Sequence, residues 1–249
     1  MCQISTTVSF MKKILTILAL LAALARPAQA DFYTTTFASG FANGGSIPDG
    51  SMIGMSDTRT LSGLTFNSIS DVDVRLTISG SWNGDLYGYL VHSSGFTVLL
   101  NRVGRSSGSA FGYSDGGFSV TFDDQASRTV DFHLYQTQPG YLASDIQGGN
   151  AWRPDGRNID PASSGATFDS TTPTALLSSF NGINPNGSWT LFLADVSGGA
   201  PNTLLNWGLD ITGTAAVAEP ASIIEGGLAV LVLGIVVSLF RIRKVLRPC

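Results

Sequence analysis

The chain has 249 residues, is 43% hydrophobic and carries a formal net charge of −4 at pH 7. Its two cysteines, Cys2 and Cys249, lie at the ends, so the segment between them has no disulfide, thiol nucleophile or cysteine-ligated metal. Residues 31–217 hold seven arginines and no lysine against sixteen aspartates and no glutamate, a formal charge of −9. This acidic balance excludes the basic patch that nucleic-acid binding requires.

The N-terminus predicts a secretory signal peptide over residues 1–30, with translation starting at Met11. Two lysines follow Met11, and Ile14–Ala25 is apolar except for one threonine. Ala28 and Ala30 then supply the small residues that signal peptidase requires at its cleavage site. Because the apolar stretch is too short to cross about 30 Å of hydrocarbon, we expect cleavage and export, not a first membrane anchor.

Residues 31–216 are predicted to form one all-β domain. Apolar and polar residues alternate over residues 71–79, 118–123, 130–134 and 205–211, which is typical of half-buried strands. In the last segment the residues expected to face the core are Leu205, Trp207, Leu209 and Ile211. Gly, Ser, Thr, Asn and Asp are abundant, and no helical stripe is convincing. The pattern favours a sandwich of two antiparallel sheets.

Two further features concern the organisation of this domain. Residues 148–170 are rich in Gly, Pro, Asp and Ser and have little periodicity. We predict a long loop there, packed onto the sandwich by Trp152 and Phe168, and not a domain boundary. The tripeptide Gly-Ser-Trp occurs at residues 80–82 and again at 187–189. A tryptophan that opens a strand is a common core anchor, so this echo does not indicate a repeat.

Two segments, residues 72–104 and 176–211, carry motifs beyond strand periodicity. The first contains Gly84-Asp85-Leu86 and the turn Ser93-Ser94-Gly95. The second contains Gly187-Ser188-Trp189-Thr190-Leu191, then Asp195, then Leu204-Leu205-Asn206-Trp207-Gly208-Leu209, and residues 122–126 between them read FDDQA. Over residues 61–211 these motifs resemble the P domain (Homo B domain), which follows the catalytic domain in subtilisin-like proprotein convertases.

The resemblance implies an eight-stranded, jelly-roll-like antiparallel β-sandwich. In the family this domain folds with and stabilises a protease, sometimes with bound calcium. The chain departs from the family at Gly80-Ser81, where His-Thr is common, and at Ser94, where the turn often has proline. A histidine in the first of these loops therefore cannot be carried over.

Catalytic machinery is not supported by the sequence. Residues 31–60 are too few for a subtilisin domain. Gly112-Tyr113-Ser114-Asp115-Gly116 fits the pattern G-x-S-x-G, but a strand and not a helix is predicted after it, so a turn is favoured over a nucleophile elbow. Only His92 and His133 could act as a base, and His133 is expected on a strand face opposite Phe132. We therefore expect a protein that is not an enzyme.

Calcium is the better site hypothesis, because aspartates on turns offer hard oxygen ligands close together. The candidate ligands are Asp85, Asp115, Asp123 and Asp124. The alternative is that these aspartates cap turns and contribute to an acidic surface.

The C-terminus, residues 217–249, predicts a membrane-spanning sorting tail. Glu219 and Pro220 precede an apolar span over residues 223–240, just long enough to cross a bilayer. Basic residues follow and predict a cytoplasmic end: Arg241, Arg243, Lys244 and Arg247. Together these features resemble a PEP-CTERM signal, which the membrane protease-transferase exosortase reads, although Ala218 stands where the family motif has its first proline. A simple single-span anchor is the alternative.

These observations predict an exported protein, held at the inner membrane by its tail until processing and then delivered to the cell surface or outside. We expect a non-catalytic binding or structural module whose partner is a matrix polysaccharide or a surface protein. Tyr87 and Tyr89 could form a sugar-stacking platform, or be buried in the sandwich. Two alternatives stay open: a secreted hydrolase with an unrecognised site, and a P domain that stabilises a separately encoded protease.

Overall fold

The computed structural model describes residues 30–199 and 201–215. The predicted signal peptide, Ala28 at its cleavage site, and the whole predicted tail lie outside these residues. That tail includes Glu219, Pro220, the span 223–240 and the basic cluster Arg241, Arg243, Lys244 and Arg247. Ala30, the last predicted signal-peptide residue, begins the first described strand. Within the described ranges, no helix combines the length and apolar character needed to cross a membrane.

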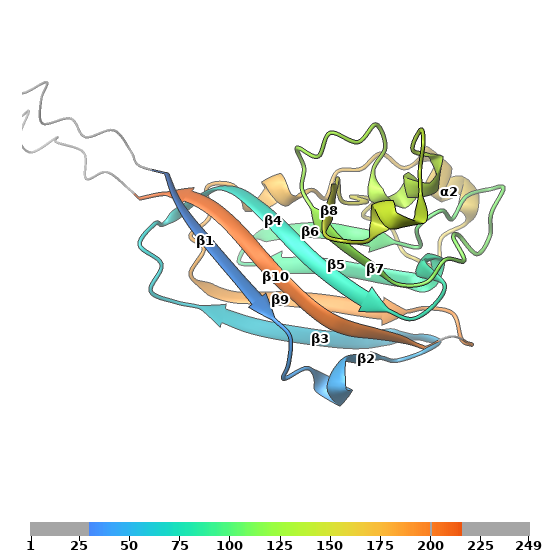
Figure 1. Ribbon diagram of the computed structural model, residues 1–249, viewed down its shortest axis with the longest axis horizontal. Helices are drawn as coiled ribbons and strands as arrows, with labels where there is room; N and C mark the ends of the chain where they lie inside the picture. The colour runs from blue at the N-terminus through green and yellow to red at the C-terminus, as the bar shows by residue number, and fades with distance from the viewer. Residues whose placement is uncertain (1–29, 200, 216–249) are drawn as a thin grey trace, which may run out of the picture. The chain divides into compact units, whose positions relative to one another are not determined.

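The described domain is mostly β-structure and consists of two sheets (Figure 1). The six-stranded sheet has the order β1-β10-β4-β7-β8, and β2 pairs with the start of β10. Its strands are β1 (Ala30–Phe37), β2 (Ser46–Ile47), β4 (Ser68–Ser79), β7 (Phe118–Phe122), β8 (Asn150–Trp152) and β10 (Asn202–Thr214). The four-stranded sheet, β3-β9-β5-β6, contains β3 (Ser51–Leu61), β9 (Gly187–Asp195), β5 (Leu86–His92) and β6 (Gly95–Asn101).

Helical structure is limited to short pieces in the connections. The one described α-helix, α2, covers Gly165–Ser170. The 3₁₀ turns are η1 (Ala42–Gly45), η2 (Asn83–Asp85), η3 (Phe132–Thr137), η4 (Ala143–Ile146) and η5 (Leu177–Phe180). The all-β prediction is thus confirmed. The prediction of purely antiparallel sheets needs one correction, because β7 and β8 pair in parallel. The finer jelly-roll assignment stays a prediction.

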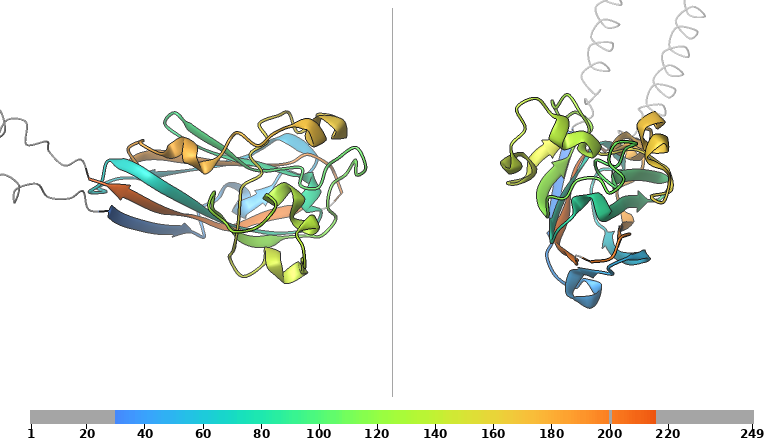
Figure 2. Two further views of the ribbon diagram at one scale, coloured as in Figure 1. Left: turned by 90° about the horizontal axis from the view of Figure 1, so that it is seen from above. Right: turned by 90° about the vertical axis from the view of Figure 1, so that its right-hand side faces the viewer.

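The core lies between the two sheets, and alternation along the strands fills it. In β4, the residues Val72, Val74, Leu76 and Ile78 are at most 2% exposed, as their period of two predicts. Phe118, Val120 and Phe122 of β7 are buried in the same way. From the other sheet, Trp189 and Leu191 of β9 face the same interior. Figure 2 shows the two sheets as facing layers.

The last strand corrects one predicted side-chain position. Its register against β4 shifts between Leu204 and Asn206, which marks a β-bulge. A bulge adds one residue and reverses the alternation on its far side. Leu204 therefore occupies the core, and Leu205 is 46% exposed instead of buried. Trp207 and the later core residues of β10 keep their predicted face.

Residues 130–134 do not form the predicted strand. Asp131 caps a 3₁₀ turn instead, with its carboxylate accepting a hydrogen bond from the backbone N–H of His133. Because the chain turns here, Phe132 and His133 are both buried and do not lie on opposite faces. Phe132 packs edge-on against Phe118 and Phe122, with ring centroids 5.2 and 5.1 Å apart. A short polar cap has overridden a period-two pattern.

The segment 148–170 is largely loop, as predicted, although β8 and α2 lie inside it. Trp152 and Phe168 are 0% and 1% exposed and attach it to the sandwich. The ends near residues 30 and 215 lie together, because Ala30 pairs with Thr214. The connections after β4 and β9 lie at the opposite end of the sheets (Figure 1). Those two connections and the one after β6 form the candidate site.

Candidate functional site

Three connections at this end surround an open cavity of about 380 Å³. Its lining comes from the loop after β4, the loop after β6 and the loop after β9. The lining residues are Trp82, Asp85, Phe111, Ser197, Gly198 and Gly199. We call this cavity the aromatic pocket. Two aromatic side chains and one carboxylate in a concave surface are the kind of lining that small-molecule sites use.

The backbone around Trp82 is held firmly. Asn83 N–H donates to the carbonyl of Asp115, and Gly84 N–H donates to the carbonyl of Tyr113, both at 2.9 Å. Gly84 must be glycine, because a Cβ there would lie 2.3 Å from the carbonyl oxygen of Phe111. Trp82 itself has a φ of +54°, a left-handed conformation that is rare for a bulky residue. Such strain persists only where the surroundings enforce it, and it concentrates at binding sites.

Trp82 and Phe111 are exposed to an unusual degree for large aromatic residues. Their exposed fractions are 39% and 67%, whereas Trp152, Trp189 and Trp207 are completely buried. An aromatic ring left in water beside a cavity forgoes the burial that would stabilise the fold. The two rings therefore offer stacking surface to a ligand.

Asp85 forms the polar wall of the pocket and is only 8% exposed. Its Oδ1 lies 3.5 Å from Nη2 of Arg102, whose Nε donates to the carbonyl of Gly84 at 2.6 Å. Burial raises the pKa of Asp85, the Ser197 hydroxyl and the Arg102 charge oppose this, and the nearby Asp49 charge adds to it. The pKa of Asp85 is thus raised chiefly because the carboxylate is buried, and Arg102 offsets only part of this effect.

Two further carboxylates lie near Asp85. Asp195 is fully buried, and its Oδ2 accepts a hydrogen bond from Nδ2 of Asn202 at 2.8 Å. Burial raises the pKa of Asp195 to about 6, and the charges of Asp49 and Asp85 contribute to the rise. Asp49 accepts hydrogen bonds from the backbone N–H of Gly199 at 3.0 and 3.2 Å. Asp49 therefore fixes the loop Ser197–Gly199, which lines one side of the pocket.

The predicted calcium ligands are not brought together. In the parts of the chain that the structure describes, no three His, Cys, Asp or Glu side chains gather so as to hold a metal ion. Asp115 accepts hydrogen bonds from Gln136 and Tyr141, and Asp123 accepts one from Gln125 N–H. Asp124 accepts from the N–H groups of Leu177 and Ser178 at the start of η5. These partners fit the turn-capping alternative, and calcium binding stays a prediction.

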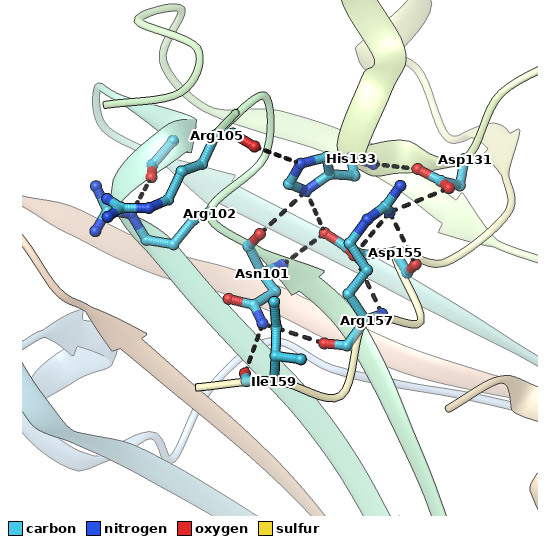
Figure 3. A network of polar contacts seen from close by, with 9 residues as sticks. Asn101, Arg102, Arg105, Asp131, His133, Asp155, Arg157 and Ile159 are labelled. Atoms are coloured by element: carbon cyan, nitrogen blue, oxygen red, sulfur yellow. Dashed lines mark hydrogen bonds and ion pairs between the residues drawn. The ribbon is translucent and has the colours of Figure 1, made fainter. Parts of the chain in front are cut away.

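His133 lies in a buried polar network that the sequence did not reveal (Figure 3). Its Nδ1 is 2.9 Å from Oδ2 of Asp155 and 3.1 Å from the carbonyl oxygen of Asn101, and its Nε2 is 3.0 Å from the carbonyl of Arg105. All three partners are acceptors, so this geometry favours an imidazolium that donates from both nitrogens. Burial opposes that charge, but Asp155 and the Arg105 carbonyl together raise the pKa of His133.

His92 is also held by the backbone. Its Nδ1 lies 3.0 Å from the carbonyl oxygen of Ser188 and its Nε2 lies 2.7 Å from that of Asn184, while the ring stacks on Trp189 at 4.0 Å. Each ring nitrogen of both histidines thus has a carbonyl or carboxylate partner. Among the described residues, neither histidine is placed to accept a proton from a serine hydroxyl. The G-x-S-x-G segment is an irregular loop that leads into β7, not into a helix.

Tyr87 and Tyr89 lie between the two predicted alternatives. Both are half-buried on the outer side of β5, whereas Leu86 and Leu90 face the core. Tyr89 stacks on Phe192 with centroids 4.7 Å apart, and it also contacts Phe96 at 5.4 Å. The rings pack mainly against one another, so they offer less free surface than Trp82 and Phe111 do.

No protein-family model matches this chain, and no curated protein is significantly similar to it. Among solved structures, one similar chain is in the complex of the serine protease of Aeromonas sobria with its chaperone. The match has 18% identity and a TM-score of 0.39, and it covers 80% of this chain and 29% of that chain. The serine protease of Aeromonas sobria alone gives 16% identity, coverages of 78% and 29%, and a TM-score of 0.38. This chain spans less than a third of those proteins, and likeness at this level carries no argument about function.

Proposed function

We propose that this chain is an exported, non-catalytic β-sandwich that binds an extracellular polysaccharide in the aromatic pocket. The observation that carries the proposal is the exposure of Trp82 and Phe111 beside the carboxylate of Asp85. A sugar ring has an apolar face of C–H groups, which stacks on aromatic rings, and an edge of hydroxyls, which donate to carboxylates. The pocket offers both kinds of partner in one concave surface.

The loop Ser197–Gly199 adds backbone groups to this site. A Cβ on Gly198 or Gly199 would meet no atom within 4 Å, so the space beside this loop is open. A bulky, hydroxylated ligand can therefore approach the main chain closely. The side chain of Ser197 interacts with Asp85, and both residues line the cavity.

The non-catalytic part of the proposal is supported by the two histidines. The hydrogen bonds of His92 and His133 go to carbonyl and carboxylate oxygens, and neither histidine lines the aromatic pocket. Ligand binding in this pocket would thus have no imidazole to serve as general base.

The test is ligand binding by the full-length chain against a panel of soluble polysaccharides that includes neutral glucans, uronic-acid polymers and amino-sugar polymers. We expect at least one of these to bind, and Trp82→Ala and Phe111→Ala each to weaken binding about tenfold or more. Phe32→Ala is the matched control, because Phe32 is also an exposed aromatic residue, at 61%. It pairs with Thr212, far along β10 from Asn202, the residue that contacts Asp195 near the pocket. Binding that survives both pocket variants would contradict the proposal.

Delivery to the outside is a separate part of the proposal, and it rests on the two ends of the sequence. Mass spectrometry of the protein from its native host tests it. We expect a mature N-terminus at Asp31 and, after exosortase processing, a new C-terminus near Glu219. An intact peptide around Phe240 would show a permanent anchor instead.

A P domain that stabilises a separately encoded protease is a second candidate. The observation in its favour is the pair of apolar residues Met52 and Ile53 on β3, which are 48% and 87% exposed and would suit a protein partner. Co-purification of a protease with the full-length chain, abolished by Ile53→Asp, would support this function. If Trp82→Ala abolished co-purification and Ile53→Asp did not, the result would count against this function.

A further inference from the structure

We infer that the sugar bound in the aromatic pocket is cationic: an amino sugar whose amine is not acetylated. This inference rests on the proposed polysaccharide binding and names the chemical class of the ligand for the same site. It follows from the charges around the pocket, from the aromatic rings that line it and from the open space beside the loop Ser197–Gly199.

The charges near the pocket are predominantly negative. Asp85 lines the cavity. The charge of Asp49 helps to raise the pKa values of both Asp85 and Asp195, and the charge of Asp85 helps to raise that of Asp195. Arg102 contacts Asp85, with Nη2 3.5 Å from Oδ1, and its Nε–H donates a hydrogen bond to the carbonyl of Gly84. Arg105 also acts on Arg102, and it keeps its positive charge while its Nε and Nη1 donate to the carbonyls of Ser163 and Ala110. Three carboxylates and two guanidiniums thus lie in this region, which leaves one negative charge in excess, and Asp85 is the carboxylate that lines the cavity.

An ammonium group entering this pocket would relieve that imbalance. It would lie next to a partly desolvated carboxylate, where attraction between opposite charges is stronger than in bulk water. A uronic-acid polymer would meet repulsion from the same three carboxylates. A neutral sugar would use the hydroxyl-binding capacity of Asp85 but gain nothing from the surplus charge.

The aromatic rings favour the same ligand. A cation over the face of a tryptophan or phenylalanine is attracted by the ring electrons. Elsewhere in the described domain, arginines occupy such faces: Arg59 lies over Phe37, and Arg128 lies over Trp152 at 4.2 Å. Among the described residues no arginine is placed over Trp82 or Phe111 in this way. Because Trp82 and Phe111 are 39% and 67% exposed, they have ring surface to offer to a positively charged substituent of the sugar.

The size of the cavity suits short stretches of a polysaccharide. About 380 Å³ lies near the lower end of the range of roughly 300–1,000 Å³ found for small-molecule sites. The cavity is open to solvent, so one unit of a longer chain can enter it. The domain as a whole, at −9 over residues 31–217, also attracts a polycation over longer distances.

The experiment is isothermal titration of the full-length chain with three oligosaccharides of equal length: a deacetylated glucosamine oligomer, its fully N-acetylated form and a neutral β-glucan oligomer. We expect the deacetylated oligomer to bind at least tenfold more tightly than the other two. This advantage should shrink as salt is raised, because it is electrostatic. Trp82→Ala should weaken binding of all three oligomers.

Asp85→Asn separates charge from shape, because it keeps the size of the side chain. We expect it to remove most of the preference for the deacetylated oligomer and to leave binding of the acetylated one within about threefold. Asp31→Asn is the control with the same change in net charge; Asp31 pairs with Gly213, near the opposite end of β10 from Asn202. That control should keep the full preference.

The outcomes distinguish the inference from the proposed function. Equal, Trp82-dependent binding of all three oligomers would overturn the inference and leave polysaccharide binding intact. Binding of none of them, together with no binding to the wider polysaccharide panel, would overturn both. If an oligolysine of matched charge binds as tightly as the amino sugar and is unaffected by Trp82→Ala, the inference also falls, because charge alone would explain the affinity.

Discussion

His133 and Asp155 form a buried pair, with Nδ1 and Oδ2 2.9 Å apart although the residues are 22 positions apart in the chain. Asp155 also receives the N–H of Asn101 at 3.0 Å and Nη1 of Arg157 at 3.1 Å. The pair therefore joins the end of β6, the turn η3 and the segment after β8 (Figure 3). The loops that these residues join are stabilised by buried ion pairs as well as by apolar packing.

We predict that this pair makes the stability of the domain depend on pH. The pKa of His133 is raised above its ordinary value of 6.5, so its stabilising contribution is complete below pH 6.5 and is lost as pH rises through the folded-state pKa. The free energy of unfolding, measured by urea titration, should fall as the pH rises from 6.5 through the folded-state pKa of His133. His133→Gln should remove this part of the pH dependence.

His133→Gln should also lower stability at pH 6, since it leaves Asp155 without one of its partners. Removing one partner of a buried pair costs about 3–5 kcal/mol, and we expect the lower end because Arg157 remains. His92→Gln is the control, since it alters the other described imidazole, whose ring nitrogens lie against carbonyl oxygens and whose ring stacks on Trp189. An unchanged pH profile in His133→Gln would show that the pair does not carry the effect.

Asp73 on β4 provides a second prediction about pH. Burial raises its pKa to about 7, and the charges of Asp123, Asp71, Asp210 and Asp124 add to this. Its stabilising contribution is complete below pH 3.8 and is lost as pH rises through 7. Asp73→Asn should therefore raise the melting temperature at pH 8 by at least about 2 °C, equivalent to about 1 kcal/mol in a domain of this size.

The same variant should have little effect near pH 3.5, where the wild-type carboxyl is already protonated. Asp123→Asn is a second check, because Asp123 is the neighbouring charge with the largest effect on Asp73. It should also stabilise the domain at pH 8. A loss of stability at pH 8 in Asp73→Asn would mean that the charged form of Asp73 is favoured by a partner.

Calcium binding is the third prediction, and the thermal melt tests it. Asp123 and Asp124 are two of the predicted ligands, and both lie near further carboxylates, since their charges act on Asp71 and Asp73. A divalent cation would reduce that repulsion, so millimolar calcium should raise the melting temperature, and a chelator should reverse the rise. Asp123→Asn should abolish the effect. A melting temperature that calcium leaves unchanged would rule this prediction out.

Regular alternation made the two central strands predictable, and local polar chemistry made the exceptions. β7, and β4 from Val72 onward, keep a period of two, so their buried residues follow from the sequence. Residues 130–134 have the same period, but the carboxylate of Asp131 caps a turn within them. In β10 the bulge between Leu204 and Asn206 moves Leu205 outward. A cap and a bulge each depend on one residue, which periodicity cannot detect.

The pocket was only partly visible in the sequence. Asp85 was singled out as a candidate ligand, whereas Trp82 and Phe111 carried no signal of their own. Gly-Ser-Trp occurs twice, and its second tryptophan, Trp189, is a core anchor in β9, completely buried. The first, Trp82, lies outside any strand in a left-handed conformation. The same three residues thus give a core side chain or a surface one, depending on the contacts of the loop around them.

The left-handed conformation of Trp82 gives the last prediction. Glycine adopts a φ of +54° without strain, whereas a residue with a Cβ pays about 1–2 kcal/mol there, partly offset by the greater freedom of glycine in the unfolded chain. Both Trp82→Gly and Trp82→Ala remove the indole ring, so their difference reports on the backbone alone. We expect Trp82→Gly to be more stable than Trp82→Ala by about 1 kcal/mol in urea unfolding.

Phe111 supplies the matched pair of variants, because its φ is not positive. There the order should reverse, with Phe111→Gly no more stable than Phe111→Ala, since glycine only adds freedom to the unfolded chain. Both Trp82 variants should lose ligand binding equally. If Trp82→Gly and Trp82→Ala were equally stable, the prediction of backbone strain at residue 82 would be wrong.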